Sequence, residues 1–494
     1  MKKSSKIILG GALVVAGLAI TYRAVNQAPD ASLPPDKQLA QIMEDGGCIF
    51  CHTANPDLPF YATWPIAKTL ITKDVEDGYK AFDIAPMMEA LKKGEAVNEV
   101  DLSKVEKAVA DGTMPLFQYY IAHWGSSLTS TKTEQVLAWV KQHREQFYPN
   151  PLAAAEFKNE PVRPIPDSIA TDPRKVALGE VLYHDTRLSG DGTISCATCH
   201  GINTAGVDNK QYSEGIKGQK GGVNAPTTYN ACFNFAQFWD GRAATLAAQA
   251  GGPPLNPVEM GSASFDEICG RIAQDAAFTA KFKEVYPEGL SEATITDAIA
   301  EYEKTLITPN SDFDRYLKGD SKAMTAEQIE GYALFKDYNC ATCHVGVAMG
   351  GQSYELMGAR ADYFKDRDMN EKSGLTDADN GRWAQTKVER DRYRFKTPTL
   401  RNVALTAPYY HDGSVTSLDK AIEMMSRYQV GRTMKPEEVK KVEAFLHALT
   451  GEYKGQKLTL APSPEKKAAL LEKVAETRDM RHAAAQKALS QRKK

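Results

Sequence analysis

The sequence predicts a mainly α-helical protein with about three domains after a hydrophobic N-terminal segment. The chain has 494 residues, which is enough for roughly three domains of about 150 residues each. Apolar residues recur three and four positions apart in several segments, as in helices with one buried face. Hydrophobic residues make up 42% of the chain and charged residues 25%, the balance of a globular protein. The net charge of -3 argues against a nucleic-acid-binding protein, which would normally carry a strongly basic domain.

The first 30 residues predict a membrane anchor. Three lysines precede an uninterrupted apolar run from Ile7 to Ile20, a pattern shared by signal peptides and signal anchors. Ala28 is the only weak candidate for the small residue that a cleavage site needs, so we favour an uncleaved anchor. The positive-inside rule keeps the lysines in the cytoplasm. We therefore expect residues 1–30 to form a cytoplasmic tip and a transmembrane anchor in a bacterial inner membrane, with the later domains in the periplasm.

Proline-rich stretches mark the expected domain boundaries. A proline cluster over 149–166 predicts a linker between a first domain at 31–155 and the rest of the chain. A softer boundary near residue 320 precedes an amphipathic segment, which divides the remainder into domains at 165–320 and 321–462. The segment that follows position 440 is also able to pack back on the domain at 165–320.

Each expected domain carries an amphipathic helix well after its start. The apolar positions at helical spacing are Val136, Trp139 and Val140; Ile295, Ile299 and Tyr302; and Val442, Phe445, Leu446 and Leu449. This weak internal repeat predicts three variants of one helical unit. Residues 463–494 predict a basic helical tail, which is either solvated or in contact with anionic lipid headgroups.

The motif Cys-x-x-Cys-His occurs three times, at 48–52, 196–200 and 340–344, and is typical of covalent attachment of c-type haem. Two thiols one helical turn apart reach the two vinyl groups of a porphyrin, and the histidine then lies against the iron. A zinc site would need a second pair of ligands for each motif. We therefore predict three cytochrome c-like domains whose haems are held by Cys48, Cys51, Cys196, Cys199, Cys340 and Cys343, with the iron ligands His52, His200 and His344. The remaining Cys232 and Cys269 are either buried thiols or a disulfide.

The sixth ligand of each iron decides whether a haem carries electrons or binds a small oxidant. For the His52 haem we predict Met114, which precedes a proline in a turn at the usual reach of a small cytochrome c domain. His123 and His143 are the competing ligands, and each is more typical of a packing or surface histidine.

From about residue 172 to residue 451 the chain resembles the bacterial dihaem cytochrome c peroxidases. The matching segments are LSGDGTISC at 188–196, NAPT at 224–227, QFWDGRA at 237–243, NPVEM at 256–260, PTLRN at 398–402 and YHDG at 410–413. With a further haem domain and an anchor in front, the whole chain resembles the membrane-anchored trihaem branch, whose members include quinol peroxidases.

The resemblance implies a role for each haem of the matching region. The His200 haem would be the peroxidatic one, and the His344 haem would transfer electrons, with Met425 as its second ligand and Met424 as the alternative. Trp239 would conduct electrons between these two haems. Asn224 and the backbone of Thr406 and Pro408 would hold one calcium ion, a hard cation that suits amide and carbonyl oxygens.

Gln249 and Glu259 match the pair that the family places beside the peroxide. Peroxide reduction needs a group that takes a proton from the iron-bound oxygen and returns one to the leaving oxygen, which suits a positioned carboxylate. An amide can orient the peroxide. Many dihaem members also have a histidine that caps the resting peroxidatic iron, whereas this chain has Ile216 at that position. We therefore expect an iron that is already open in the oxidised protein.

The expected function is the reduction of hydrogen peroxide to water at the His200 haem, with electrons relayed through the His52 and His344 haems. The anchor favours quinol as the donor, and a soluble cytochrome c or a cupredoxin is the alternative. A trihaem electron carrier without peroxidase activity is the competing function, and the acid/base pair Gln249 and Glu259 argues against it. A relative that oxidises tyrosine or tryptophan on a partner protein would have tyrosine in place of Met425.

Overall fold

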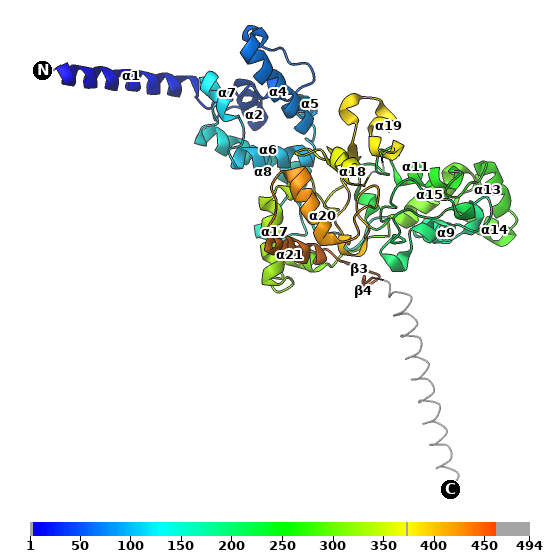
Figure 1. Ribbon diagram of the computed structural model, residues 1–494. Helices are drawn as coiled ribbons and strands as arrows, with labels where there is room; N and C mark the ends of the chain where they lie inside the picture. The colour runs from blue at the N-terminus through cyan, green and yellow to red at the C-terminus, as the bar shows by residue number, and fades with distance from the viewer. Residues whose placement is uncertain (1–2, 372–373, 461–494) are drawn as a thin grey trace.

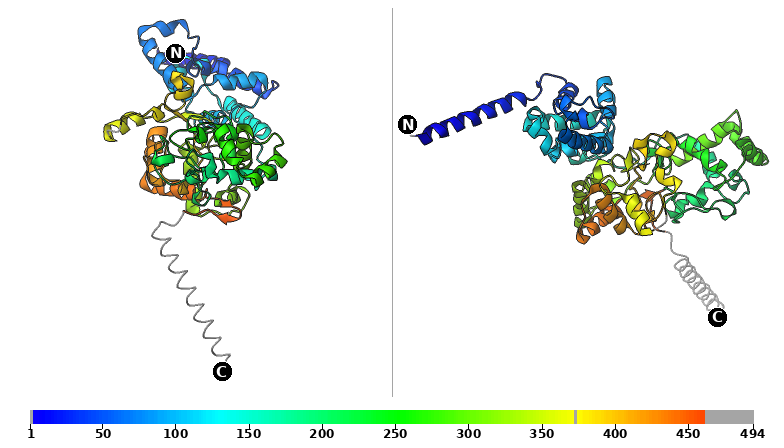
Figure 2. Two further views of the ribbon diagram at one scale, coloured as in Figure 1. Left: turned by 90° about the vertical axis from the view of Figure 1, so that its right-hand side faces the viewer. Right: turned by 45° about the horizontal axis from the view of Figure 1, so that its top comes forward.

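The structure is a computed structural model that describes residues 3–371 and 374–460, and the chain is mainly α-helical. Helix α1 (Lys3–Val25) projects from the body of the molecule (Figure 1). Three large hydrophobic cores organise the rest, and each includes a cysteine of one Cys-x-x-Cys-His motif. We call the parts built on these cores the first, second and third unit in the order of their motifs. Figures 1 and 2 show the third unit lying between the first and the second. The basic tail predicted at 463–494 lies outside the described residues.

The predicted membrane anchor is wrong. Within 3–371 and 374–460, no helix is both long enough and apolar enough to cross a membrane. The uninterrupted apolar run of α1 explains the result: from Ile7 to Ile20 it measures about 21 Å at 1.5 Å per residue, against a hydrocarbon core of about 30 Å. The inner-membrane location inferred from that anchor is corrected with it.

The first unit is a set of helices closed by α8. Asn98 caps α6 by accepting a hydrogen bond from the Val100 amide, and the Thr129 hydroxyl caps α8. Val136, Trp139 and the following valine point into the core, as their spacing predicted. The helical elements are α2 (Pro35–Asp45), α3 (Cys48–Cys51), η1 (Phe60–Thr63), α4 (Pro65–Ala81), α5 (Ala85–Lys93), α6 (Glu99–Ala110), α7 (Phe117–Ala122), η2 (Trp124–Ser126) and α8 (Ser130–Phe147).

The second unit is built on the crossing of α9 with α15. A Cβ at Gly179 would lie 1.9 Å from the Ala298 carbonyl oxygen, so only glycine allows this close approach. Ser291 begins α15 with a capping box. Its elements are α9 (Pro173–Tyr183), η4 (Thr186–Leu188), α10 (Cys196–Cys199), η5 (Ile202–Thr204), η6 (Ile216–Gly218), η7 (Ala231–Phe233), α11 (Leu246–Ala250), α12 (Gly252–Leu255), α13 (Phe265–Ile272), α14 (Ala276–Val285) and α15 (Glu292–Glu303).

The third unit repeats this crossing with α17 and α21. A Cβ at Gly331 would lie 1.9 Å from the Lys441 carbonyl oxygen. The two antiparallel strands β1 and β2 pair Tyr354 with Lys396. Its elements are α16 (Asp312–Leu317), α17 (Ala326–Asp337), η8 (Cys340–Thr342), β1 (Tyr354–Leu356), α18 (Tyr363–Glu371), η9 (Asp377–Asn380), α19 (Trp383–Thr386), η10 (Glu389–Asp391), β2 (Arg394–Lys396), η11 (Val403–Leu405), α20 (Leu418–Met425), the π-helical turn η12 (Ser426–Val430) and α21 (Pro436–His447).

The second and third units exchange short segments. Phe313 and Leu317 of α16 lie before the boundary expected at residue 320, yet they are buried in the third core. In return, Tyr453 and Leu458 pack against the second core. They belong to or follow a small antiparallel ladder of β3 (Glu452–Tyr453) and β4 (Gln456–Lys457). Sequence order and packing order therefore differ at both ends of the third unit.

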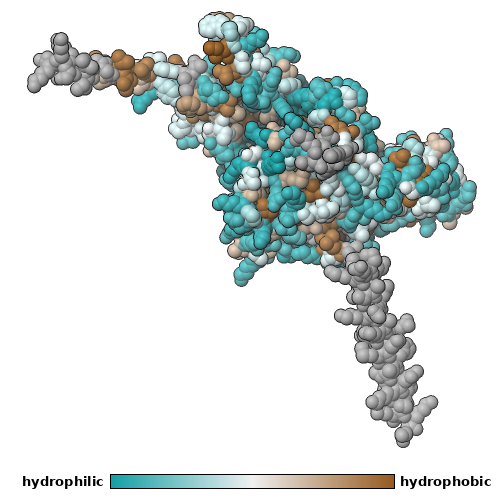
Figure 3. Space-filling model, in the orientation of Figure 1, coloured by the Kyte–Doolittle hydropathy of each residue, from teal (hydrophilic) through white to brown (hydrophobic). Residues whose placement is uncertain are grey.

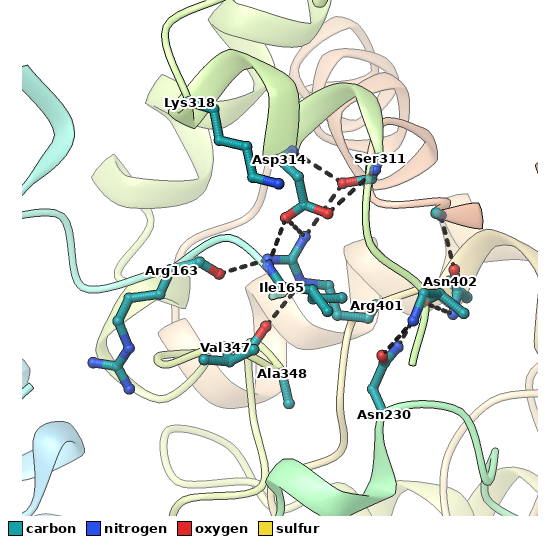
Figure 4. Close-up of polar contacts among 12 residues, drawn as sticks. Arg163, Ile165, Asn230, Ser311, Asp314, Lys318, Val347, Ala348, Arg401 and Asn402 are labelled. Atoms are coloured by element: carbon teal, nitrogen blue, oxygen red, sulfur yellow. Dashed lines mark hydrogen bonds and ion pairs between the residues drawn. The ribbon is translucent and has the colours of Figure 1, made fainter. Parts of the chain in front are cut away.

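A buried ion pair between Arg401 and Asp314 joins the linker to the third unit (Figure 4). The two side chains have no exposed surface, and their charged atoms lie 2.9 Å apart. Arg401 also donates to the carbonyl oxygens of Val347 and Arg163, at 2.9 and 2.8 Å. Asp314 accepts a hydrogen bond of 3.1 Å from the Ile165 amide. Beside this pair, Asn402 and Asn230 both bond to Thr308, which links the second unit to the same region.

The first unit docks on the third through α6. This helix contacts η8, the turn that contains the third Cys-x-x-Cys-His motif. The Lys104 ammonium lies 2.8 and 3.0 Å from the two carboxylate oxygens of Glu355, and both side chains are largely buried. Burial alone would lower the pKa of Lys104, but the Glu355 carboxylate outweighs it, so the pKa is raised and the lysine stays charged. The Asn98 side chain adds a hydrogen bond of 3.0 Å to the Gln352 carbonyl oxygen.

We expect a double-mutant cycle of Lys104→Met and Glu355→Gln to give a coupling energy of about 1–3 kcal/mol. Each single change leaves the other side chain charged or polar and largely buried without its partner. Chemical denaturation of the four proteins measures this energy. The control is the exposed pair of Lys93 and Glu89 on α5, at 2.7 Å, which should couple by only about 0.3–0.5 kcal/mol. Equal coupling energies in both cycles would mean that the buried Lys104–Glu355 pair contributes no more to stability than an exposed pair.

Candidate functional site

The three Cys-x-x-Cys-His motifs have similar local geometry. In the first two motifs a single α-helical turn spans both cysteines and the histidine follows directly, whereas in the third a 3₁₀ turn ends at Thr342, before Cys343 and His344. The Nδ1 atom of each histidine faces a backbone carbonyl oxygen: Phe82 at 3.0 Å from His52, Gly206 at 3.3 Å from His200, and Met349 at 3.0 Å from His344. This contact fixes the ring and leaves Nε2 available as an iron ligand.

One cavity of about 1460 Å³ contains both the first and the third motif. Its wall includes the histidines His52 and His344 together with the cysteines of the same two motifs, and Lys104 of the docking helix α6 also lines it. Two binding spaces that belong to different units therefore open into one another. The motifs predict a haem in each unit, but no sequence pattern indicates this connection.

The residues around the motifs fit a large apolar group. Burial raises the pKa of the thiols, to about 11 for Cys48 and about 12 for Cys196 and Cys340. Burial also lowers the pKa of all three motif histidines, which favours the neutral imidazole that can bind iron. The apolar surroundings, the paired thiols and the oriented imidazoles together suit a covalently attached porphyrin.

The predicted sixth ligands lie in the shared cavity. Met114 and Met425 both line it, on the sides of the first and third motif respectively. Met114 is 38% exposed and belongs to a turn with a cis bond to Pro115. Met424, the alternative to Met425, packs instead against the aromatic cluster around Phe364. Met114 and Met425 therefore remain the predicted sixth ligands, and the place of Met425 in the cavity favours it over Met424.

We expect Met114→Leu to lower the reduction potential of the first haem by at least about 59 mV, a tenfold change in the one-electron equilibrium. Methionine opposite histidine raises the potential of c-type haem, and leucine cannot bind iron. Redox titration of the haem-loaded protein measures the change, and electron paramagnetic resonance should show a high-spin iron. Met88→Leu in the first core is the matched control. An unchanged potential in Met114→Leu would exclude this ligand.

Trp239 lies between the second and third units. Its indole Nε1 donates a hydrogen bond of 2.9 Å to the Asn224 carbonyl oxygen, and its own carbonyl oxygen accepts one of 2.7 Å from the Lys396 amide. Trp239 and Asn224 both line the shared cavity, together with Thr406 and Pro408. The sequence-predicted conduit and the predicted calcium ligands therefore occupy one region.

The calcium prediction rests on neutral oxygens. The Asn224 amide nitrogen donates to the carbonyl oxygens of Lys210 and Gln211, at 2.9 and 3.3 Å, which leaves its side-chain oxygen for another partner. Asn209 holds the neighbouring loop by bonding the Ala407 carbonyl oxygen at 2.8 Å. In the described part of the chain, no group of three or more His, Cys, Asp or Glu is placed to hold a metal ion. Any cation here would therefore be bound by amide and carbonyl oxygens.

Glu259 and Gln249 lie in the second unit, and both are partly buried. The Glu259 carboxylate accepts a hydrogen bond of 2.9 Å from the Asn256 side chain. Burial raises the pKa of Glu259, although Arg242 and Asn256 oppose the shift. Gln249 belongs to α11, which packs on α15. A carboxyl whose pKa is moved toward neutrality is suited to accept and return a proton.

Ile216, which the family resemblance aligns with a capping histidine, is buried. Its amide donates a hydrogen bond of 2.8 Å to the Glu259 carbonyl oxygen, so the two loops are joined. Its side chain packs against Gly261, where a Cβ would lie 2.2 Å from the isoleucine Cδ1. An aliphatic side chain held in this way cannot bind iron.

The sequence analysis missed the surroundings of Trp239. His411 is buried, lies 6.4 Å from Trp239 between ring centroids, and stacks on Phe395 at 4.2 Å. Its Nε2 contacts the Asp379 carboxylate at 2.8 Å, and Arg367 bridges this carboxylate to a second one. The YHDG segment at 410–413 contains this histidine, but Arg367 of α18 and Asp379 of η9 belong to a part of the chain with no recognisable motif.

The cysteines outside the motifs are free. Cys232 and Cys269 are not bonded to each other, and they pack in different places. Cys232 packs with Ala231 and Leu246, whereas Cys269 packs on the second core. The disulfide alternative is thus not adopted in the structure.

Comparison with known proteins gives consistent matches. Residues 173–322 match the family described as di-haem cytochrome c peroxidase, and residues 13–142 match a haem-binding domain. The chain is 45% identical over 467 residues to the cytochrome c peroxidase Ccp of Escherichia coli (strain K12), covering 92% of this chain and 98% of that protein. It is 44% identical over 308 residues to the cytochrome c551 peroxidase of Nitrosomonas europaea, covering 62% of this chain and 88% of the relative.

A solved structure also resembles the chain. The crystal structure of a MauG-like protein associated with microbial copper homeostasis matches with a TM-score of 0.52 and 28% identity, over 58% of this chain and 95% of that chain. The Escherichia coli relative, by contrast, matches over nearly the full length of both chains, so the likeness includes the first unit. On this evidence the chain belongs to the di-haem cytochrome c peroxidase family.

Proposed function

We propose that the protein carries three covalent c-type haems in three cytochrome c-like units and reduces hydrogen peroxide to water at the His200 haem. The cavity shared by the first and third motifs is the observation that carries this proposal. It gives electrons from a haem at His52 a direct way to a haem at His344. Each turnover consumes one peroxide, two electrons and two protons and releases two waters. The haem supplies the redox chemistry when bound, and the chain supplies orientation and protons.

The order of the units supports a relay from the first through the third to the second. The third unit lies in the middle (Figure 2), and Lys104 fixes the first unit against it. Trp239 lines the cavity of the third motif and precedes α11 of the second unit in the chain. It is placed to conduct electrons onward. We propose that calcium at Asn224, Thr406 and Pro408 stiffens this same junction.

At the second motif, Glu259 would take a proton from bound peroxide and return it to the leaving oxygen, while Gln249 orients the peroxide. The raised pKa of Glu259 supports this role. Because Ile216 cannot bind iron, we propose that the second haem is open in the oxidised protein. Met114 and Met425 would close the other two haems and limit them to electron transfer.

We propose quinol as the electron donor, and the surface of the first unit supports it. Phe60, Trp64 and Ile66 are exposed by 77%, 58% and 82%, an unusual gathering of apolar side chains around η1 and the start of α4. In Figure 3 part of the same unit is coloured as hydrophobic. The Tyr61 hydroxyl is hydrogen-bonded to the Nε2 atom of His123 beside them, and such a pair would take up one of the two protons that quinol releases, while the other passes to water.

The test is peroxide-dependent oxidation of a ubiquinol or menaquinol analogue by the haem-loaded full-length protein, with a reduced small cytochrome c as the alternative donor. Turnover with quinol supports the whole proposal. Turnover with the cytochrome but not with quinol would support the peroxidase activity and would overturn quinol as the donor. Absence of turnover with either donor, in a protein shown to contain three haems, would overturn the proposal and favour an electron carrier.

A further inference from the structure

Glu303 is a buried acid that peroxide reduction, as described above, does not use. It is the last residue of α15, and only 5% of its surface is exposed. Its Oε2 atom is completely buried and has no hydrogen-bond partner. A carboxylate without partners in such a place is strongly disfavoured relative to water, so the protonated form is the one that the site accommodates.

The groups around Glu303 do not stabilise its charge. Tyr183 of α9, Cys196 of α10 and Cys232 of η7 all interact with it electrostatically, and none of these three carries a charge at neutral pH. Lys304 is the adjacent residue, but its ammonium is paired with Glu301 on the same helix. Burial alone therefore governs the acid and raises its pKa to about 8. A modest change of nearby charge is enough to move it across the physiological range.

The place of Glu303 links it to the second motif. Cys196, the first cysteine of that motif, interacts electrostatically with Glu303, so a haem attached there would lie within range of its charge. Glu303 also lies one helical turn after Ala300, which packs with Leu246 of α11. Helix α11 carries Gln249, the residue proposed to orient peroxide. The acid thus lies between the attachment side of the second haem and the helix of the peroxide pocket.

We propose that Glu303 is a redox-linked proton site of the second haem. Its carboxylate takes up one proton when that haem accepts one electron, because the added negative charge favours the neutral acid. When the haem gives up the electron, the proton is released. One electron and one proton therefore enter and leave together. This equal ratio matches peroxide reduction, which uses two electrons and two protons. The inference rests on the haem at His200 in the proposed function, but it does not depend on peroxide turnover or on the donor.

The experiment is a spectroelectrochemical titration of the second haem in the full-length protein from about pH 6 to about pH 10, without peroxide. In the unmodified protein the reduction potential should fall by up to about 59 mV for each unit of rising pH. This slope corresponds to a tenfold change in the one-electron equilibrium constant per pH unit. Glu303→Gln cannot exchange a proton and should lose most of this slope. Glu292→Gln, which changes an exposed acid at the start of the same helix, is the matched control and should keep it. An unchanged slope in Glu303→Gln would overturn the proposal.

A second measurement does not depend on how the variant folds. Redox-difference infrared spectroscopy of the unmodified protein should show a protonated carboxyl band that gains intensity when the second haem is reduced and that shifts in heavy water. Absence of any such band would also overturn the proposal. Failure of the peroxidase assay would leave both readouts intact, so the two hypotheses fail separately.

Discussion

Replacing Glu259 with glutamine should lower the kcat of peroxide reduction by about 10²–10⁴-fold, the usual contribution of a positioned acid/base group. Glutamine keeps the size of the side chain and can still bond to Asn256, so the loop should keep its shape. It cannot accept a proton from peroxide. Stopped-flow or steady-state assays with saturating donor measure the change, and haem content should stay the same.

The pH dependence of the same reaction gives an independent check. Glu259 must be deprotonated to accept a proton, so activity should fall as the pH drops through its pKa. Because burial raises that pKa, the acidic limb should lie above about pH 4.3, the ordinary value for glutamate. Glu259→Gln should lack this limb, whereas Glu284→Gln, an exposed acid in the same unit, should keep both rate and limb. A variant at 259 with full activity would assign the proton transfer to another group.

Replacing Arg401 with methionine should destabilise the junction of linker and third unit by about 3–5 kcal/mol, the cost of leaving a buried charge without its partner. Asp314 would keep its bonds to backbone amides but lose the charge that balances it. The carbonyl oxygens of Val347 and Arg163 would lose their donor as well. Denaturant unfolding followed by the absorbance of the third haem measures the loss.

The matched control for this substitution is Arg427→Met. Arg427 also pairs with an aspartate, Asp366, at 2.9 Å, but 62% of its side chain is exposed. Exposed pairs contribute roughly 0–1 kcal/mol, so this variant should unfold almost as the unmodified protein does. Similar small losses for both arginines would mean that water reaches the Arg401 site and that the network is weaker than its burial indicates.

The helices and the three attachment motifs were predictable because they depend on residues close together in the sequence. Apolar spacing places Val136 and Trp139 in the first core, and a Cys-x-x-Cys-His turn needs only five residues to form. The proposed peroxidatic pair, Gln249 and Glu259, comes from the family resemblance, because Glu259 lies inside a distinctive segment. Local patterns of this kind hold whatever the rest of the chain does.

Features that depend on distant residues could not be predicted in the same way. The docking pair Lys104 and Glu355 joins residues far apart in sequence, and a lysine on a helix is usually a solvated surface residue. Phe313 was assigned to the wrong side of a boundary because packing of the units, not sequence order, decides its core. The prediction of a membrane anchor was wrong for a different reason. It rested on the apolar composition of the segment, but the length of an apolar run decides whether it can span a membrane.

The proline-rich linker has a consequence for motion. Its residues are bonded on both sides: the Arg163 guanidinium contacts Glu99 of the first unit at 2.9 Å, while the Arg163 carbonyl oxygen accepts a hydrogen bond from Arg401. A flexible tether would set an effective concentration for docking, and electron delivery would then wait for diffusive encounters. Here the linker is fixed to both units and does not act as a flexible connection. Internal electron delivery should therefore be insensitive to solvent viscosity and should slow when glycine–serine spacers are inserted between Pro149 and Pro161.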